Sequence, residues 1–147
     1  MNAMTNIQST LALVDDDSHS ARLMIRMLLA HGAPSVGWHE SCESGVAEIG
    51  KLLADGSRLP GLVIVDVKAS STATNQCVAR LRQLPGGDAL VIAAMTPTLA
   101  REVREATLAA GADAVFERHS DINAYRKEAA AMVSFWVRNQ RLDAVGT

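Results

Sequence analysis

Two apolar runs in this sequence end on acidic residues, and this pattern constrains the fold more than any other feature. LVIVD (62–66) stops on Asp66, and LALV (11–14) is followed directly by three aspartates. Continuous apolar runs bounded by loop residues are typical of parallel strands that are buried on both faces. In open α/β sheets the functional crevice lies beyond the carboxyl ends of such strands. We therefore expect these carboxylates to gather at one edge of a sheet.

The expected cluster of Asp15, Asp16 and Asp66 brings like charges close together, which is costly unless a cation or a proton neutralises them. Oxygen ligands in a polar crevice favour a hard divalent ion such as Mg²⁺. The simpler interpretation is a solvated carboxylate edge, or a helix N-cap at Asp17 or Ser18. Because two strand ends contribute, we favour an acidic pocket whose chemistry is phosphoryl transfer or metal binding.

The rest of the chain alternates short apolar segments with segments of helical periodicity. Five βα units in succession predict a doubly wound α/β fold, with a parallel five-stranded sheet, helices on both faces and right-handed crossovers. Strands are predicted at 11–14, 35–38, 62–67, 89–95 and 114–117, and helices over about 18–33, 44–54, 74–84, 99–110 and 122–142.

Composition narrows the classes of partner and compartment. The 147 residues fit one domain, and a net charge of −2 with scattered basic residues argues against nucleic acid or a membrane surface as partner. The N-terminus lacks the pattern of a signal peptide and no apolar run reaches transmembrane length, so we expect a soluble, cytoplasmic protein. Cys42 and Cys77 are interpreted as free thiols, with a disulfide left open, and the four histidines as surface or capping groups.

Polar residues follow four of the predicted strands: Asp15 and Asp16 the first, Asp66 the third, Thr96 the fourth and Arg118 the fifth. Thirty positions separate Asp66 from Thr96, and twenty-two separate Thr96 from Arg118. In this order and spacing, residues 10–140 resemble the receiver domain of two-component response regulators, especially the single-domain chemotaxis type.

The resemblance implies a flavodoxin-like strand order 2-1-3-4-5, with a flexible segment at 1–9, a receiver domain at 10–142, a tail at 143–147 and no output domain. It implies a stand-alone response regulator, which accepts a phosphoryl group from a histidine kinase or phosphotransfer protein and signals to an unknown protein by contact. Such a chain is a signalling phospho-acceptor rather than an enzyme, apart from phosphotransfer onto its own aspartate and slow self-hydrolysis.

The resemblance also assigns roles to single residues. Asp66 is the phospho-acceptor, Thr96 supplies the switch hydroxyl, and Arg118 pairs with the phosphoryl group where the family usually has Lys. Mg²⁺ shields the charges. Its predicted ligands are Asp16 directly, Asp15 through water, Asp66, and the backbone carbonyl of Lys68.

Several positions depart from the family pattern. Pro97 removes a backbone N–H that would stabilise the phosphoryl group, and Val115 stands where an aromatic residue moves with the switch. Lys68 would place an extra cation over the site, and His119 replaces a proline. These departures keep open a second interpretation: a protein-binding module of the same fold with a weakened or lost phosphorylation switch.

Other folds with related chemistry fit less well. A haloacid-dehalogenase-like phosphatase needs a second Asp two residues after the nucleophile, where this chain has Lys68. Neither the dinucleotide-binding nor the P-loop glycine fingerprint is present.

In the last predicted helix, Phe135, Val137 and Leu142 fall partly outside the core stripe. Two interpretations stay open: the helix simply packs down, or it exposes an apolar strip for a partner or a homodimer.

Overall fold

The computed structural model describes residues 10–146, with side chains through residue 140, so the predicted flexible segment 1–9 lies outside the described residues. The described chain forms a single five-stranded parallel sheet of order β2-β1-β3-β4-β5, which confirms the predicted fold class and strand order. The strands are β1 (Leu11–Asp15), β2 (Val36–His39), β3 (Leu62–Asp66), β4 (Ile92–Thr96) and β5 (Ala114–Glu117).

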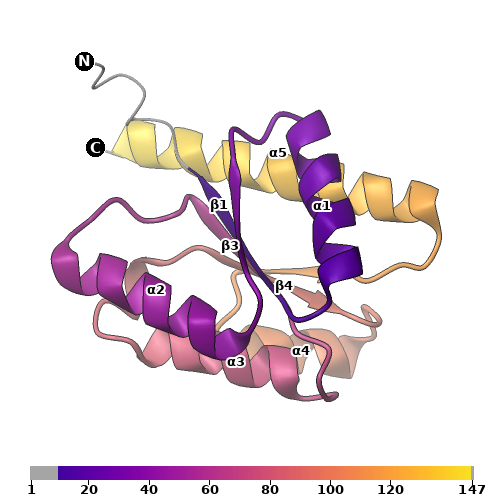
Figure 1. Ribbon diagram of the computed structural model, residues 1–147, viewed down its shortest axis with the longest axis horizontal. Coiled ribbons are helices and arrows are strands. Elements are labelled where there is room, and N and C mark those ends of the chain that lie inside the picture. Colours follow the sequence, from indigo (N-terminus) through magenta and orange to yellow (C-terminus); the bar gives the residue numbers. More distant parts are fainter. Residues whose placement is uncertain (1–9, 147) are drawn as a thin grey trace.

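Helices cover both faces of the sheet in three layers (Figure 1): α1 and α5 lie on one face, and α2, α3 and α4 lie on the other. Their bounds are α1 (Ser18–Ala30), α2 (Cys42–Asp55), α3 (Ala73–Gln83), α4 (Arg101–Ala110) and α5 (Ile122–Gly146). None of these helices is long and apolar enough to cross a bilayer.

The strands alternate their side chains between two separate cores. Leu13 and Ile64 pack in the cluster beneath α1 and α5, whereas Val14 and Val65 pack in the cluster beneath α2 and α3. Successive residues of a strand point to opposite faces. Because both faces are covered, every residue of β1 and β3 is buried, which explains why their sequences are continuous apolar runs.

Three element boundaries differ by three residues or more from those predicted, and the others by two or fewer. Helix α1 ends at Ala30 and not at about residue 33, and the other two differences concern β4 and α5. The fourth strand begins at Ile92 and not at residue 89, because Gly87–Ala89 forms a short 3₁₀ turn, η2, entered through Gly86 at φ 83°. Helix α5 continues to Gly146, so most of the predicted 143–147 tail is helical.

The apolar residues of α5 largely pack inward. Phe135 makes an edge-to-face contact with Phe116, with ring centroids 6.2 Å apart, and Val137 packs against the same core. The side chain of Leu142 lies outside the described residues. Phe135 and Val137 are therefore residues that pack down, and up to residue 140 Ile122 is the exposed large apolar side chain of α5.

Helix α2 approaches β1 closely at Gly45. A Cβ atom at this position would lie 2.9 Å from Cγ2 of Val14, a buried and stiff side chain. Gly50, in the same helix, would place its Cβ 3.4 Å from the flexible Leu84 side chain, which is ordinary contact.

We predict that Gly45→Ala destabilises the fold, because overpacking costs about 1–3 kcal/mol and exceeds the gain in helix propensity. Gly50→Ala is the matched control, and there the propensity gain of about 0.5–1 kcal/mol should prevail. Urea denaturation of both variants measures the difference. Equal stability of the two would show that α2 can shift away from β1 without cost.

Candidate functional site

The carboxyl ends of the strands bring the predicted acids together. Asp15 and Asp66 are the last residues of β1 and β3 and lie directly opposite each other in the register of these two strands. Both side chains are buried, with 0% and 1% of Asp15 and Asp66 exposed. Thr96 ends β4 and is buried as well, and Arg118 follows β5 directly.

Asp15 is held by three donors. Its Oδ1 accepts from the Asp17 backbone N–H at 2.9 Å and lies 2.7 Å from Nζ of Lys68, and its Oδ2 accepts from the Ser20 hydroxyl at 2.8 Å. Burial raises the pKa of this carboxyl above its usual value, and the hydrogen bond from Lys68 is the largest of the opposing effects. A buried carboxylate here therefore depends on its cationic neighbour.

Lys68 stands between the two buried acids. Its Nζ lies 2.7 Å from Oδ1 of Asp15, 3.0 Å from Oδ2 of Asp66 and 3.3 Å from the Asp66 carbonyl oxygen. Its backbone N–H donates to Oδ1 of Asp16 at 2.9 Å. The side chain is only 25% exposed, so the ammonium group is part of the pocket and not a solvated surface charge.

Arg118 neutralises the other side of Asp66. Its Nε and Nη2 both lie 2.7 Å from Oδ1 of Asp66, and Nη2 also donates to the Met95 carbonyl at 3.3 Å. The two nitrogens converge on one carboxylate oxygen, leaving Oδ2 to Lys68. Asp66 thus has a separate cation on each oxygen.

This arrangement does not fit a divalent ion at the predicted position. All four side-chain oxygens of Asp15 and Asp66 already accept from donors, and the Lys68 ammonium contacts one oxygen of each acid. Asp16, the predicted direct ligand, is exposed and instead accepts the Lys68 backbone N–H. Within the described residues, no three His, Cys, Asp or Glu side chains form a group that could hold a metal ion.

Thr96, the predicted switch residue, has its hydroxyl bonded away from Asp66. Its hydroxyl donates to the Thr98 carbonyl at 2.7 Å, inside the β4–α4 loop, and the Thr98 hydroxyl accepts from the Ala100 N–H at 3.1 Å. Pro97 between them is exposed and has no N–H to offer. A cavity of about 210 Å³ lies beside this loop and is lined by Thr96, Pro97 and Arg118, among others.

A second hollow, of about 280 Å³, opens on the other side of Asp66 and includes Ser20, Lys68, Arg118 and Tyr125 in its wall. Burial raises the pKa of the Tyr125 hydroxyl, and the charges of Asp66 and Asp15 raise it further. Tyr125 lies on α5, so this hollow joins the acidic pocket to that helix.

The sequence did not reveal four contacts of the site. The Trp38 indole N–H donates to the Asp15 carbonyl at 2.9 Å, and the Thr74 hydroxyl holds the loop after β3 through the N–H and carbonyl of Val67. Ser20 and Tyr125 are the other two. The one available signal in the sequence was weak: Ser20 lies five residues after Asp15, in the first turn of a helix.

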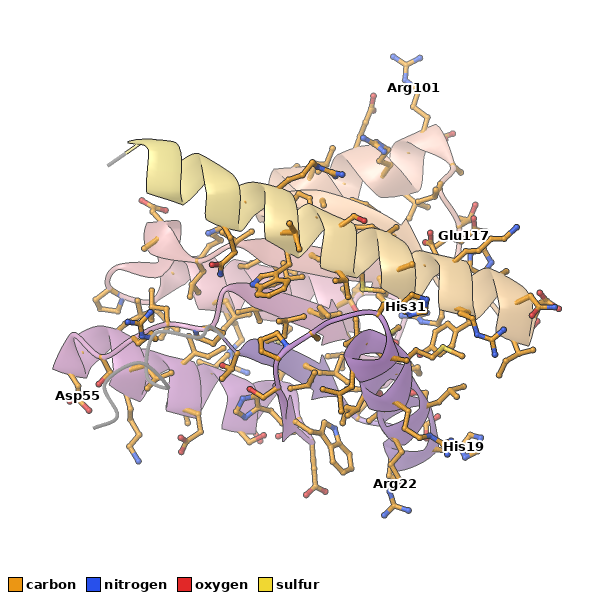
Figure 2. All side chains as sticks on the ribbon, turned by 90° about the horizontal axis from the view of Figure 1, so that it is seen from above. His19, Arg22, His31, Asp55, Arg101 and Glu117 are labelled. Atoms are coloured by element: carbon orange, nitrogen blue, oxygen red, sulfur yellow. The ribbon has the colours of Figure 1, made fainter. Side chains whose placement is uncertain are left out.

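Two of the four histidines, His19 and His31, are the exposed or capping groups that were expected, whereas His39 and His119 are half-buried. Figure 2 shows His19 and His31 at opposite ends of α1, with His31 beside α5. His31 closes the C-terminal end of α1, where its Nδ1 lies 2.8 Å from the Met27 carbonyl. Both cysteines are free, and burial raises the pKa of the Cys77 thiol.

Comparison with solved structures identifies similar folds. The phosphorylated cyanobacterial phytochrome response regulator RcpA matches with a TM-score of 0.72 and 11% identity, over 88% of this chain and 94% of its own. The Mn²⁺-bound response regulator Rcp1 matches at 0.70 and 15%, over 87% and 94%. The Vibrio cholerae chemotaxis protein CheY4 matches at 0.63 and 18%, over 82% and 94%.

The structural neighbours are response regulator receiver domains, so the predicted resemblance is confirmed for the fold of nearly the whole chain. No protein-family model matches the sequence, and no curated protein is similar enough to match. The chain therefore has the receiver fold with a sequence far from the solved examples.

We predict that Arg118→Gln lowers the free energy of unfolding by about 1–3 kcal/mol, because it removes a charged partner from the buried Asp66. The control is Arg101→Gln, whose ion pair with Glu105 is exposed and should contribute less than about 1 kcal/mol. Chemical denaturation at neutral pH measures both. Equal losses would mean that Lys68 alone suffices to neutralise Asp66.

Proposed function

We propose that this chain is a receiver-type signalling protein that accepts a phosphoryl group on Asp66 and passes the signal on through protein contact. The observation that carries the proposal is the position of Asp66, at the carboxyl end of the central strand, with Arg118 from the end of β5 on its carboxylate. Ligand chemistry in open α/β sheets is placed at this edge. The receiver fold of the neighbours, one of them phosphorylated, supports it.

The proposed reaction is an in-line transfer. An oxygen of the Asp66 carboxylate attacks the phosphorus of a phosphohistidine, the P–N bond breaks, and its electron pair stays on the imidazole of the partner. Arg118 and Lys68 lie within reach to offset the added negative charge. The donor is a histidine kinase or a phosphotransfer protein, which places the proposed reaction in the cytoplasm.

Mg²⁺ at this site stays a prediction from the resemblance. A neighbour of the same fold binds Mn²⁺, which supports a metal in such pockets. The contacts of Lys68 in this chain oppose it, because the ammonium has to leave before an ion can bridge Asp15 and Asp66.

A second candidate function is a protein-binding module of the receiver fold that has lost the phosphorylation switch. Two observations favour it: Asp66 carries a cation on each oxygen, and the Thr96 hydroxyl is engaged by Thr98. Pro97 adds to them by removing the N–H that would face a phosphoryl group.

We predict that a small-molecule phosphodonor in Mg²⁺ buffer adds one phosphoryl group to the wild-type chain and none to Asp66→Asn. Intact-mass spectrometry measures the product, and Asp88→Asn, at an exposed aspartate of η2, is a control that should label normally. A wild-type chain that stays unmodified at saturating donor would favour the binding module.

A further prediction concerns the stabilisation of a phosphoryl mimic such as beryllium fluoride. Pro97→Ala restores a backbone donor worth on the order of 1.5–3 kcal/mol for a charged acceptor, so it should tighten binding about tenfold or more. Arg118→Ala should weaken binding more than Thr96→Ala, because Arg118 already contacts Asp66 and Thr96 does not. NMR titration measures the affinities, and an unchanged Pro97→Ala variant would exclude the missing amide as the limiting feature.

A further inference from the structure

The Lys68 ammonium group makes its hydrogen bonds inside the acidic pocket. A lysine ammonium has three N–H donors. In this structure each one has an acceptor in the pocket: Oδ1 of Asp15 at 2.7 Å, Oδ2 of Asp66 at 3.0 Å and the Asp66 carbonyl at 3.3 Å. The group is therefore fully coordinated by oxygen atoms from the ends of two neighbouring strands.

The backbone around Lys68 holds it in this position. Its own N–H is bonded to Oδ1 of Asp16, which lies on the loop after β1. One residue earlier, the Thr74 hydroxyl bonds both the N–H and the carbonyl of Val67 and fixes the loop to the start of α3. The predicted metal ligand Asp16 thus serves to anchor the lysine.

The charges of the pocket balance without any added ion. Asp15 and Asp66 are the two buried acids, and Lys68 and Arg118 are the two cations in contact with them. Buried carboxylates require such partners, since an unpaired charge in the interior is strongly destabilising. Of these two cations, Lys68 forms ion pairs with both acids in the described structure, whereas Arg118 pairs with Asp66.

We propose that the Lys68 ammonium is the resident cation of this acidic pocket and takes the place of a divalent metal ion. The pocket is then assembled and neutral in the absence of metal, and Mg²⁺ and the Lys68 ammonium exclude each other. This inference concerns the pocket before any phosphoryl transfer, so it does not rest on Asp66 being a phospho-acceptor.

The test is divalent-ion binding by the full chain, measured as the free Mn²⁺ signal in electron paramagnetic resonance and as heat of Mg²⁺ titration. Wild type should show no saturable site, and neither should Lys51→Ala, whose lysine is exposed and pairs only with Glu48. Lys68→Ala should gain one site per chain, at least about tenfold tighter than any wild-type binding, because no charge-assisted bonds have to break first. Adding Asp15→Asn to Lys68→Ala should remove the gained site.

Thermal unfolding gives a second readout. In chelator, Lys68→Ala should melt below wild type, and Mg²⁺ should raise its melting temperature while leaving that of wild type unchanged. If Lys68→Ala does not fold in chelator, Lys68→Gln, which removes the charge but keeps a hydrogen-bond donor on a side chain one atom shorter, takes its place in both experiments.

Two results would overturn the inference. One is saturable Mg²⁺ binding by wild type that Asp15→Asn removes, because the ion would then bind with Lys68 present. The other is a folded Lys68→Ala or Lys68→Gln chain that gains no site. Neither result bears on phosphoryl labelling of Asp66, so the failure of this inference and that of the proposed function are distinguishable.

Discussion

The burial of two carboxylates side by side is the constraint on which the site depends. Asp15 and Asp66 end adjacent strands in register, about 4.8 Å apart in backbone spacing, and neither is exposed to water. Their repulsion and desolvation have to be offset from within the protein. The loop after β3 supplies Lys68 and the end of β5 supplies Arg118, so that one ion-pair network joins three segments at the edge of the sheet.

The source of the positive charge determines how such a pocket responds to its surroundings. A metal ion neutralises the acids only while it is bound, and its occupancy depends on the metal concentration and on pH. A lysine from the same loop is always present, and its effective concentration is set by the fold. With Lys68 in place, the positive charge of the pocket is part of the native structure, and the proposed phosphoryl group on Asp66 would meet two side-chain cations already in contact with the carboxylate.

A hydrogen bond in the loop after β4 holds the Thr96 hydroxyl away from Asp66. The Thr96 hydroxyl is bonded to Thr98, so reaching toward Asp66 requires breaking that bond as well as moving the backbone next to Pro97. On β5, Phe116 packs against Phe135 of α5, and its neighbour Val115 stands where the resemblance to receiver domains led us to expect an aromatic residue. Asp66 and Tyr125 line the same hollow, so α5 borders the acidic pocket as well.

The sequence alone determined the parallel sheet and the acids at the ends of its strands, because these depend on local properties. The strand order 2-1-3-4-5 was implied by the resemblance to receiver domains, and the structure confirms it. A continuous apolar run such as Leu62–Asp66 predicts a strand buried on both faces wherever it lies, and the alternation with helices dictates parallel connections. Spacing along the chain also placed Thr96 and Arg118 at the same edge. The start of β4 was predicted too early, since a 3₁₀ turn at Gly87–Ala89 is a matter of a few dihedral angles that apolar content does not reveal.

Only the tertiary structure decided what the acids bind. The Lys68 ammonium meets Asp15 across 53 positions of sequence and the Trp38 indole meets the Asp15 backbone across 23, and no local pattern encodes such contacts. From the sequence, Lys68 was predicted to be a metal ligand through its carbonyl and to place an extra cation over the site, and Asp16 was predicted to be a ligand through its carboxylate. The structure shows the cation, and it shows that its partners are Asp15 and Asp66. The direction of a long, flexible side chain depends on the charges and the space around it. Here the Lys68 side chain extends to two buried carboxylates that lie opposite each other in the sheet.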